Sequence, residues 1–146
     1  MTTKEFIDII DNYSLLDIND PRTDESYLYE LTDKLDGNKD AILCIEPILR
    51  LIEKYPTADF GSPGPLVHTV ERFRGQYELK LLDSLDRRPT PLTIWMLNRV
   101  INGETNEARQ RTLIKRLDGI TRDLNVDDEV RKNAMEFLRF QSKRRQ

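Results

Sequence analysis

The sequence predicts an all-α protein of about seven helices arranged as antiparallel hairpins. Apolar residues recur at helical spacing along almost the whole chain. No segment alternates apolar and polar side chains for long enough to predict a β-strand. Short turn signals separate the helical segments, among them INDPR at 18–22 and RRPTP at 87–91. These three observations together predict helices joined by short turns.

The first three helices are predicted from amphipathic spacing and from the residues that end them. The first is expected at Lys4–Leu16, and the second at Asp24–Leu35, where the sequence DGN follows. The third, Lys39–Tyr55, is apolar on more than half of its circumference, so we expect other helices to cover it on two sides. Pro47 lies within it and predicts a kink or a break near Ile45.

Two further helices follow, one on each side of the RRPTP turn. The fourth is expected at Pro65–Leu85, with Gly75 inside it at a point where another backbone could approach closely. The fifth is expected to run to Gly103, with Thr90 as its N-cap and Pro91 at its first position.

The last two helices are predicted at Asn106–Leu124 and Asp127–Ser142. The acidic DDE at the start of the last helix suits a helix N-terminus, and the terminal KRRQ is expected to fray. The sixth helix shows an apolar stripe made of Leu113, Leu117, Ile120 and Leu124.

The helix lengths indicate how these elements stack. Pairing the second helix with the third, the fourth with the fifth and the sixth with the seventh gives units of roughly 35–40 residues, close to the repeat lengths of α-solenoids. We therefore expect a HEAT-like α–α superhelix, with a globular helical bundle as the alternative. The length of 146 residues predicts a single domain that spans residues 1–146.

Composition narrows the location of the protein. No apolar run is long enough for a membrane span, and the start MTTKEFIDII lacks the features of a secretory signal. We expect a cytoplasmic protein that does not contact a membrane. Cys44 is the only cysteine and lies in the apolar run AILCI, so it is expected to be a buried hydrophobic residue.

The charge is distributed unevenly along the chain. Residues 1–60 have a formal charge of −8 and residues 61–146 have +5. The acidic part predicts a carboxylate-rich surface that meets a basic protein partner, with tyrosines as anchors; the alternative is that these residues are solvated faces and caps. The candidate partner-binding residues in this part are Asp8, Asp11, Asp17, Asp20, Asp24, Glu25 and Tyr27.

The segment DFGSPGPLVH at 59–68 contains two glycines, two prolines and the only histidine. A kinase-like metal site at Asp59, a Ser62–His68 nucleophile pair and a metal site at His68 and Glu71 all lack the further residues that such sites require. We expect no catalytic residue, no metal and no cofactor, and no small-molecule substrate is evident. The segment is predicted to be a rigid turn that starts a helix, with Asp59 and His68 as further candidates for partner contact.

Basic residues of the sixth helix raise the alternative of nucleic-acid binding. Arg111, Lys115 and Arg122 fall on one line, but Glu107 and Asp118 are placed to pair with two of them at i, i+4 spacing. Nearby Arg109 and Arg116, and the tail, are expected to add unpaired positive charge. The pI of about 5.3 argues against a phosphate-binding protein.

The block YPTADFGSPGPLVHTVERF, continued by RRPTPLTIWMLNRVING, resembles a segment of small helical bacterial proteins. Some of these resemble immunity proteins of contact-dependent or polymorphic toxin systems with HEAT-like hairpins. The resemblance spans Tyr55–Gly103 and implies no catalytic motif. It implies a small cytoplasmic protein that binds and neutralises a toxin. Together with the acidic surface, this predicts a non-enzymatic protein that docks on a basic toxin domain and occludes its active site. The alternative is a helical scaffold or regulator without a toxin partner.

Overall fold

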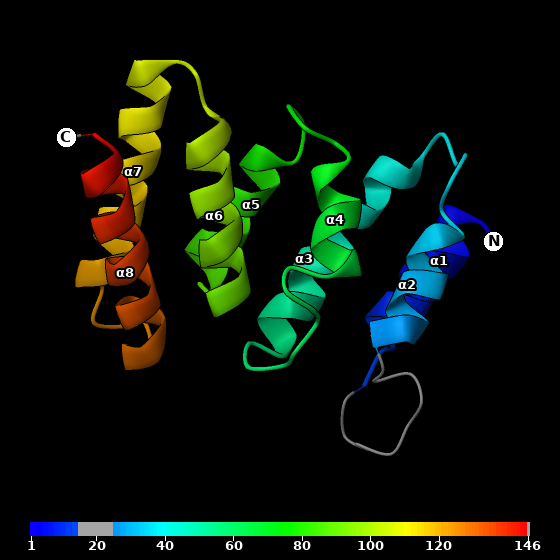
Figure 1. Cartoon of the computed structure of the whole chain (residues 1–146). Helices are drawn as coiled ribbons and strands as arrows, with labels where there is room; N and C mark the ends of the chain where they lie inside the picture. Colours follow the sequence, from blue (N-terminus) through cyan, green and yellow to red (C-terminus); the bar gives the residue numbers. More distant parts are fainter. Residues whose placement is uncertain (15–24, 146) are drawn as a thin grey trace. The chain divides into compact units, whose positions relative to one another are not determined.

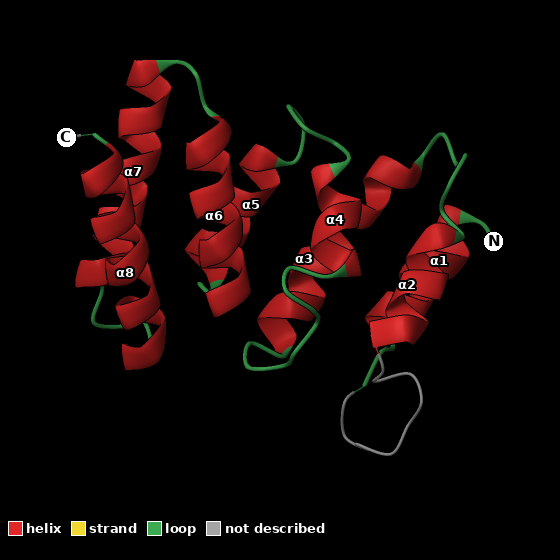
Figure 2. Cartoon of the chain, viewed as in Figure 1, coloured by secondary structure: helices red, strands yellow, loops and turns green. Residues whose placement is uncertain are grey.

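A computed structural model describes residues 1–14 and 25–145 of the chain. These residues form eight α-helices and one 3-10 helix and contain no strand (Figure 2), so the prediction of an all-α fold is confirmed. The chain divides into two compact units, Met1–Lys80 (unit 1) and Leu81–Gln146 (unit 2). The single domain over residues 1–146 stays a prediction.

Unit 1 contains four α-helices, a 3-10 helix and the start of a fifth α-helix (Figure 1). Helix α1 packs on η2 and α3, α2 packs on α4, and α3 packs on α4. Helix α5 begins in unit 1 and ends in unit 2. The bounds are α1 Thr3–Asp11, α2 Glu25–Asp33, η2 Ala41–Cys44, α3 Ile45–Lys54, α4 Pro65–Glu71 and α5 Glu78–Arg87.

The predicted break in the third helix is confirmed. The chain forms the 3-10 helix Ala41–Cys44 and then starts α3 at Ile45. Pro47 therefore lies in the first turn of α3, where its missing N–H removes no helical hydrogen bond. The helix is covered on two sides, by α1 and by α4, as its wide apolar face predicts.

The prediction of one helix over Pro65–Leu85 is wrong, because the chain breaks it into α4 and α5. Gly75 adopts a φ of 90°, a left-handed conformation that ends a helical run. Gly75 N–H donates to Glu78 Oε1 at 2.8 Å, which ties the turn to the first residue of α5. No atom lies within 4 Å of a Cβ placed on Gly75, so the expected close backbone approach is also wrong.

The start of α1 is bonded to the turn that follows α2. Thr3 Oγ1 donates to Asp40 Oδ1 at 2.6 Å, and Asn38 Nδ2 donates to the Met1 carbonyl at 3.1 Å. These bonds join residues more than thirty positions apart and hold the two helices antiparallel. The end of α1 and the start of α2 therefore lie at the same end of unit 1 (Figure 1).

Unit 2 contains the end of α5 and three longer helices, with α8 packed on both α6 and α7. Thr90 accepts a hydrogen bond from Thr93 N–H at 3.1 Å as the N-cap of α6, and Pro91 is the first helical residue, as predicted. Asn106 caps α7 in the same way. The bounds are α6 Pro91–Gly103, α7 Glu107–Arg122 and α8 Asp128–Arg144.

Two sequence predictions in unit 2 are wrong in detail. Helix α7 ends at Arg122, and Leu124 is 84% exposed in the turn that follows, so it does not extend the apolar stripe. The buried residue of this turn is Val126. Helix α8 continues to Arg144, whose guanidinium donates to Asn102 of α6, so the tail is helical for longer than expected.

A buried amide cluster joins α6 to α8. Gln141 is 1% exposed, and its Nε2 donates to Asn98 Oδ1 at 2.7 Å and to Asn102 Oδ1 at 2.8 Å. A buried amide whose donors are satisfied in this way favours one register of the two helices. The cluster therefore fixes how α8 lies along α6.

We predict that Gln141→Met destabilises the protein by about 1–3 kcal/mol, because Asn98 Oδ1 would stay buried without its donor. Urea unfolding followed by circular dichroism measures the change. Lys143→Met, an exposed change on the same helix, is the control and should leave the unfolding midpoint almost unchanged. Equal midpoints for Gln141→Met and the unmodified chain would show that the cluster adds no stability.

Gly75→Ala and Gly119→Ala should change stability in opposite directions. Alanine at Gly75 must adopt a left-handed conformation, which costs about 1 kcal/mol. Alanine at Gly119 meets no atom within 4 Å and raises helix propensity in α7, a gain of up to about 1 kcal/mol. Thermal melts of the two variants test the pair, and a shift of both in the same direction would contradict this explanation.

Candidate functional site

Helix α1 presents its acidic residues to solvent. Thr2 caps the helix, accepting from Glu5 N–H at 3.1 Å while Glu5 Oε2 accepts from Thr2 N–H at 2.9 Å. This capping box fixes the helix start. Phe6 is fully buried, whereas Asp8 and Asp11 lie on the opposite, exposed face.

Helix α2 adds acidic residues and two tyrosines. Leu28 is 1% exposed and anchors the helix to the core. Glu25 is exposed at the helix start, Tyr27 is half-buried and Tyr29 is 42% exposed. Of the two tyrosines, Tyr29 therefore offers the larger exposed aromatic surface.

Most of the carboxylates on these two helices are not neutralised. Among the described residues, no side chain forms an ion pair or a hydrogen bond with five of them: Asp8, Asp11, Glu25, Glu30 and Asp33. Other acidic residues of unit 1 form ion pairs. Asp36, for example, pairs with Arg72 at 2.7 Å. The predicted site residues Asp17, Asp20 and Asp24 lie outside the described residues. We call the five free carboxylates the α1–α2 acidic surface.

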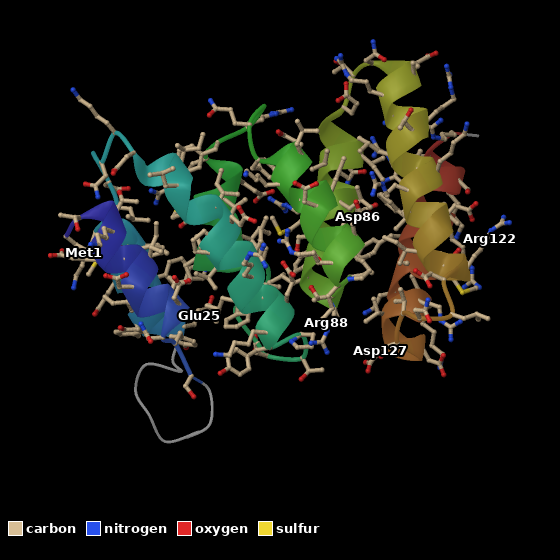
Figure 3. All side chains as sticks on the ribbon, turned by 180° about the vertical axis from the view of Figure 1, so that it is seen from behind. Met1, Glu25, Asp86, Arg88, Arg122 and Asp127 are labelled. Carbon is tan, nitrogen blue, oxygen red and sulfur yellow. The ribbon has the colours of Figure 1, made fainter. Side chains whose placement is uncertain are left out.

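The loop before α4 brings Asp59 close to Glu25. Asp59 Oδ1 accepts a hydrogen bond from Gly61 N–H at 2.9 Å. Glu25 Oε1 lies 2.8 Å from the position that a Cβ on Gly61 would occupy. Both carboxylates therefore lie against Gly61, and the loop adds a further acid beside the start of α2. Figure 3 labels Glu25 at the start of α2.

This loop requires both of its glycines. Gly61 and Gly64 have φ values of 110° and 90°. A Cβ on Gly64 would lie 1.9 Å from the Phe60 carbonyl oxygen, and one on Gly61 would lie 2.4 Å from Gly64 Cα. Phe60 is 2% exposed and Pro65 is the first residue of α4. The prediction of a turn that starts a helix is confirmed, with Pro65 at the first helical position.

His68 does not join a chemical cluster. Its side chain is 52% exposed on α4, and Nδ1 lies 3.8 Å from Glu71 Oε1. No group of three or more possible metal ligands occurs among the described residues. His68 therefore lies on the surface, and its role in partner contact stays a prediction.

The basic residues of α7 are more fully paired than the sequence indicates. Arg111 lies 3.9 Å from Glu107 and Arg122 lies 3.3 Å from Asp118, as the i, i+4 spacing predicts. The expectation that Arg109 and Arg116 are unpaired is wrong. Arg109 pairs with Glu104 at 3.2 Å, and Arg116 pairs with Asp86 of α5. These contacts remove much of the free positive charge that a nucleic-acid site would use.

Two features of the site could not be found from the sequence. The approach of Glu25 to Gly61 joins segments 36 residues apart, and no local pattern signals it. The partner of Arg116, Asp86, lies thirty residues away on another helix. By contrast, the exposed position of Tyr29 agrees with helical spacing from the buried Leu28 and Leu31.

Comparisons of the chain with protein-family models, curated proteins and solved structures each found no match. Within the part of the chain that the structure describes, no helix combines the length and apolar composition needed to span a bilayer.

Cys44 lies in the buried core of unit 1, and the pKa of its thiol provides a test of that burial. It is fully buried, and burial raises the pKa of its thiol from 9.0 to about 11. The folded chain thus keeps the thiol proton to a higher pH than the unfolded chain. The resulting stabilisation is complete below about pH 9 and is lost as the pH rises through 11.

We predict that the free energy of unfolding falls by about 2 kcal/mol between pH 9 and pH 11 through this thiol alone. Comparing urea unfolding of the unmodified chain with that of Cys44→Ala at both pH values isolates the effect. A thiol reagent should also label the folded chain slowly and the unfolded chain fast. The same pH dependence in both proteins would contradict the prediction.

Proposed function

We propose that this chain is a protein-binding module that uses the α1–α2 acidic surface to dock on a basic protein domain. The observation that supports it is that, among the described residues, five carboxylates of the short helices α1 and α2 are free. Unit 1 as a whole contains 16 acidic and nine basic residues, a formal charge of −7. Free like charges within one unit raise the energy of the isolated protein, and a basic partner relieves that repulsion.

The role we propose for this module is that of a cytoplasmic immunity protein that occludes the active site of a cognate bacterial toxin. Toxins that act on nucleic acid need a basic surface, because their substrate is a polyanion. An acidic surface competes for that same region and steers the encounter through long-range attraction. Tyr29, and at the edge of the surface the half-buried Tyr27, provide aromatic contact area.

The helix contacts fit a HEAT-like stack, which we propose as the architecture behind this surface. Helices contact their next-but-one neighbours: α1 with α3 and α2 with α4 in unit 1, and α6 with α8 in unit 2. In stacked hairpins each helix contacts the equivalent helix of the next pair in this way. Such stacks present extended faces, and these commonly bind other proteins.

Co-expression tests the immunity role directly. The toxin candidate is the product of the gene adjacent to the one that encodes this chain, expressed in a host that it kills. The chain should restore growth and co-purify with the toxin as a complex. If the chain binds the toxin but leaves its activity intact, the module is a scaffold or regulator and the immunity role is wrong.

The acidic surface is tested by reversing its charge. We predict that the triple variant Asp8→Lys, Asp11→Lys, Glu25→Lys slows association with the toxin by at least about tenfold at low salt. The difference should shrink at high salt, because screening removes the long-range attraction. Stopped-flow fluorescence at several ionic strengths measures the association rate constant.

A matched control variant changes the net charge by the same amount at residues outside the α1–α2 acidic surface. Asp83→Lys, Glu129→Lys, Glu136→Lys alters three exposed carboxylates of unit 2. It should slow association far less than the α1–α2 variant. Equal rates for the two variants would mean that net charge alone drives the encounter, and the α1–α2 surface would lose its assignment.

A further inference from the structure

A groove in unit 2 lies between the C-terminal end of α5 and the second half of α7, and the turn after α7 forms part of its wall. Its volume is about 510 Å³, within the range of roughly 300–1,000 Å³ that ligand sites occupy. All of its lining residues belong to unit 2. In Figure 3, Asp86 is labelled on α5, on the side of that helix toward α7.

The base of the groove is apolar. Leu85 of α5, Ile120 of α7 and Val126 of the following turn line it, and each is less than a tenth exposed. Leu124 lies between two lining residues and is 84% exposed.

Most of the charged side chains at the rim of the groove have an ion pair, a hydrogen bond or another interaction within the protein. Arg116 pairs with Asp86 across the groove, and Asp123 Oδ1 accepts a hydrogen bond from Asn125 N–H at 2.9 Å. Arg87 also has an interaction within the protein. Lys115 is the exception, because no described residue forms an ion pair or hydrogen bond with its ammonium group. The charged lining residues are Asp86, Arg87, Lys115, Arg116 and Asp123, so the lining has a net charge of +1.

Gly119 leaves open space one turn after Lys115. It lies in the middle of α7, where glycine is less favourable than alanine by about 0.5–1 kcal/mol. No neighbouring atom requires its small size, because a Cβ there would meet nothing within 4 Å. The missing side chain exposes the α7 backbone between Lys115 and Asp123, where the main chain of a ligand could lie close.

We propose that this groove binds an extended acidic segment of a partner protein. A carboxylate of the segment pairs with Lys115, and an adjacent apolar side chain packs on Leu85, Ile120 and Val126. The net charge of +4 in unit 2 attracts such a segment. The site is separate from the α1–α2 acidic surface, which takes a partner of opposite charge, so each proposal can fail without the other.

The test uses an array of hexapeptides that combine two Asp or Glu residues with two Leu, Ile or Phe residues. A second array has Asn or Gln in place of the acids. The full-length labelled chain should bind members of the acidic array and not their neutral counterparts. Fluorescence anisotropy of the best acidic peptide should show at least a tenfold weaker Kd for Lys115→Glu.

Two substitutions at Gly119 separate blocking of the groove from a change in helix stability. Gly119→Leu fills the open space and should abolish peptide binding, whereas Gly119→Ala should retain it within about twofold. Thermal melts confirm that both variants fold, and Lys115→Glu, an exposed change, gives an independent readout.

Three outcomes would overturn the proposal. The first is that the labelled chain binds no peptide of the acidic array. The second is equal retention of the acidic and neutral peptides, which would mean that Lys115 selects no charge. The third is a Kd unchanged by Lys115→Glu or Gly119→Leu, which would place the peptide elsewhere. The α1–α2 charge-reversal variant should bind the peptide like the unmodified chain, so a failure here leaves the acidic surface untouched.

Discussion

Unit 1 depends on the burial of α3 from two sides. Five aliphatic side chains of this ten-residue helix are buried, and they pack toward α1 and η2 on one side and α4 on the other. Truncating such a side chain to alanine typically costs about 2–5 kcal/mol, a large part of the stability of a small domain. Helix α2 in turn packs on α4. Both helices of the acidic surface are therefore held, directly or through α4, by α3.

This dependence explains how unit 1 tolerates the repulsion among its carboxylates. Helices α1 and α2 have nine residues each, too short to be stable alone in water. Phe6, Ile10, Leu28 and Leu31 attach them to the core, so their position is set by apolar burial. Within residues 1–14 and 25–145, the carboxylates of the α1–α2 acidic surface form no ion pair that holds these helices, and for that reason they are available to a partner.

The sequence predicted the fold where local chemistry decides the structure. Thr90 and Pro91 start α6 as expected, and Pro47 separates η2 from α3, because capping and the missing proline N–H act within one turn. Local spacing failed at Gly75, where a glycine inside an amphipathic pattern adopts a positive φ that the pattern does not signal. It also failed at Leu124, since the helix ends before the apolar stripe does and Val126 takes the buried position.

The sites were less predictable than the fold, because they depend on which charged side chains form ion pairs or hydrogen bonds with residues distant in the sequence. The sequence identified Asp8, Asp11 and Glu25 as a group, but it could not show that Asp59 and Glu25 both lie against Gly61. It also assigned free charge to Arg116, which the fold pairs with Asp86.

Charge counts along a chain thus indicate the sign of a field and not the location of a site. A charge becomes informative when its neighbours are known and it still has no partner. By this criterion the two units differ in kind: among the described residues, unit 1 has several free carboxylates on α1 and α2, and unit 2 has a free ammonium group beside a groove that several apolar side chains line. The first arrangement favours fast, salt-sensitive association over a broad area, whereas the second favours recognition of one carboxylate next to one apolar side chain.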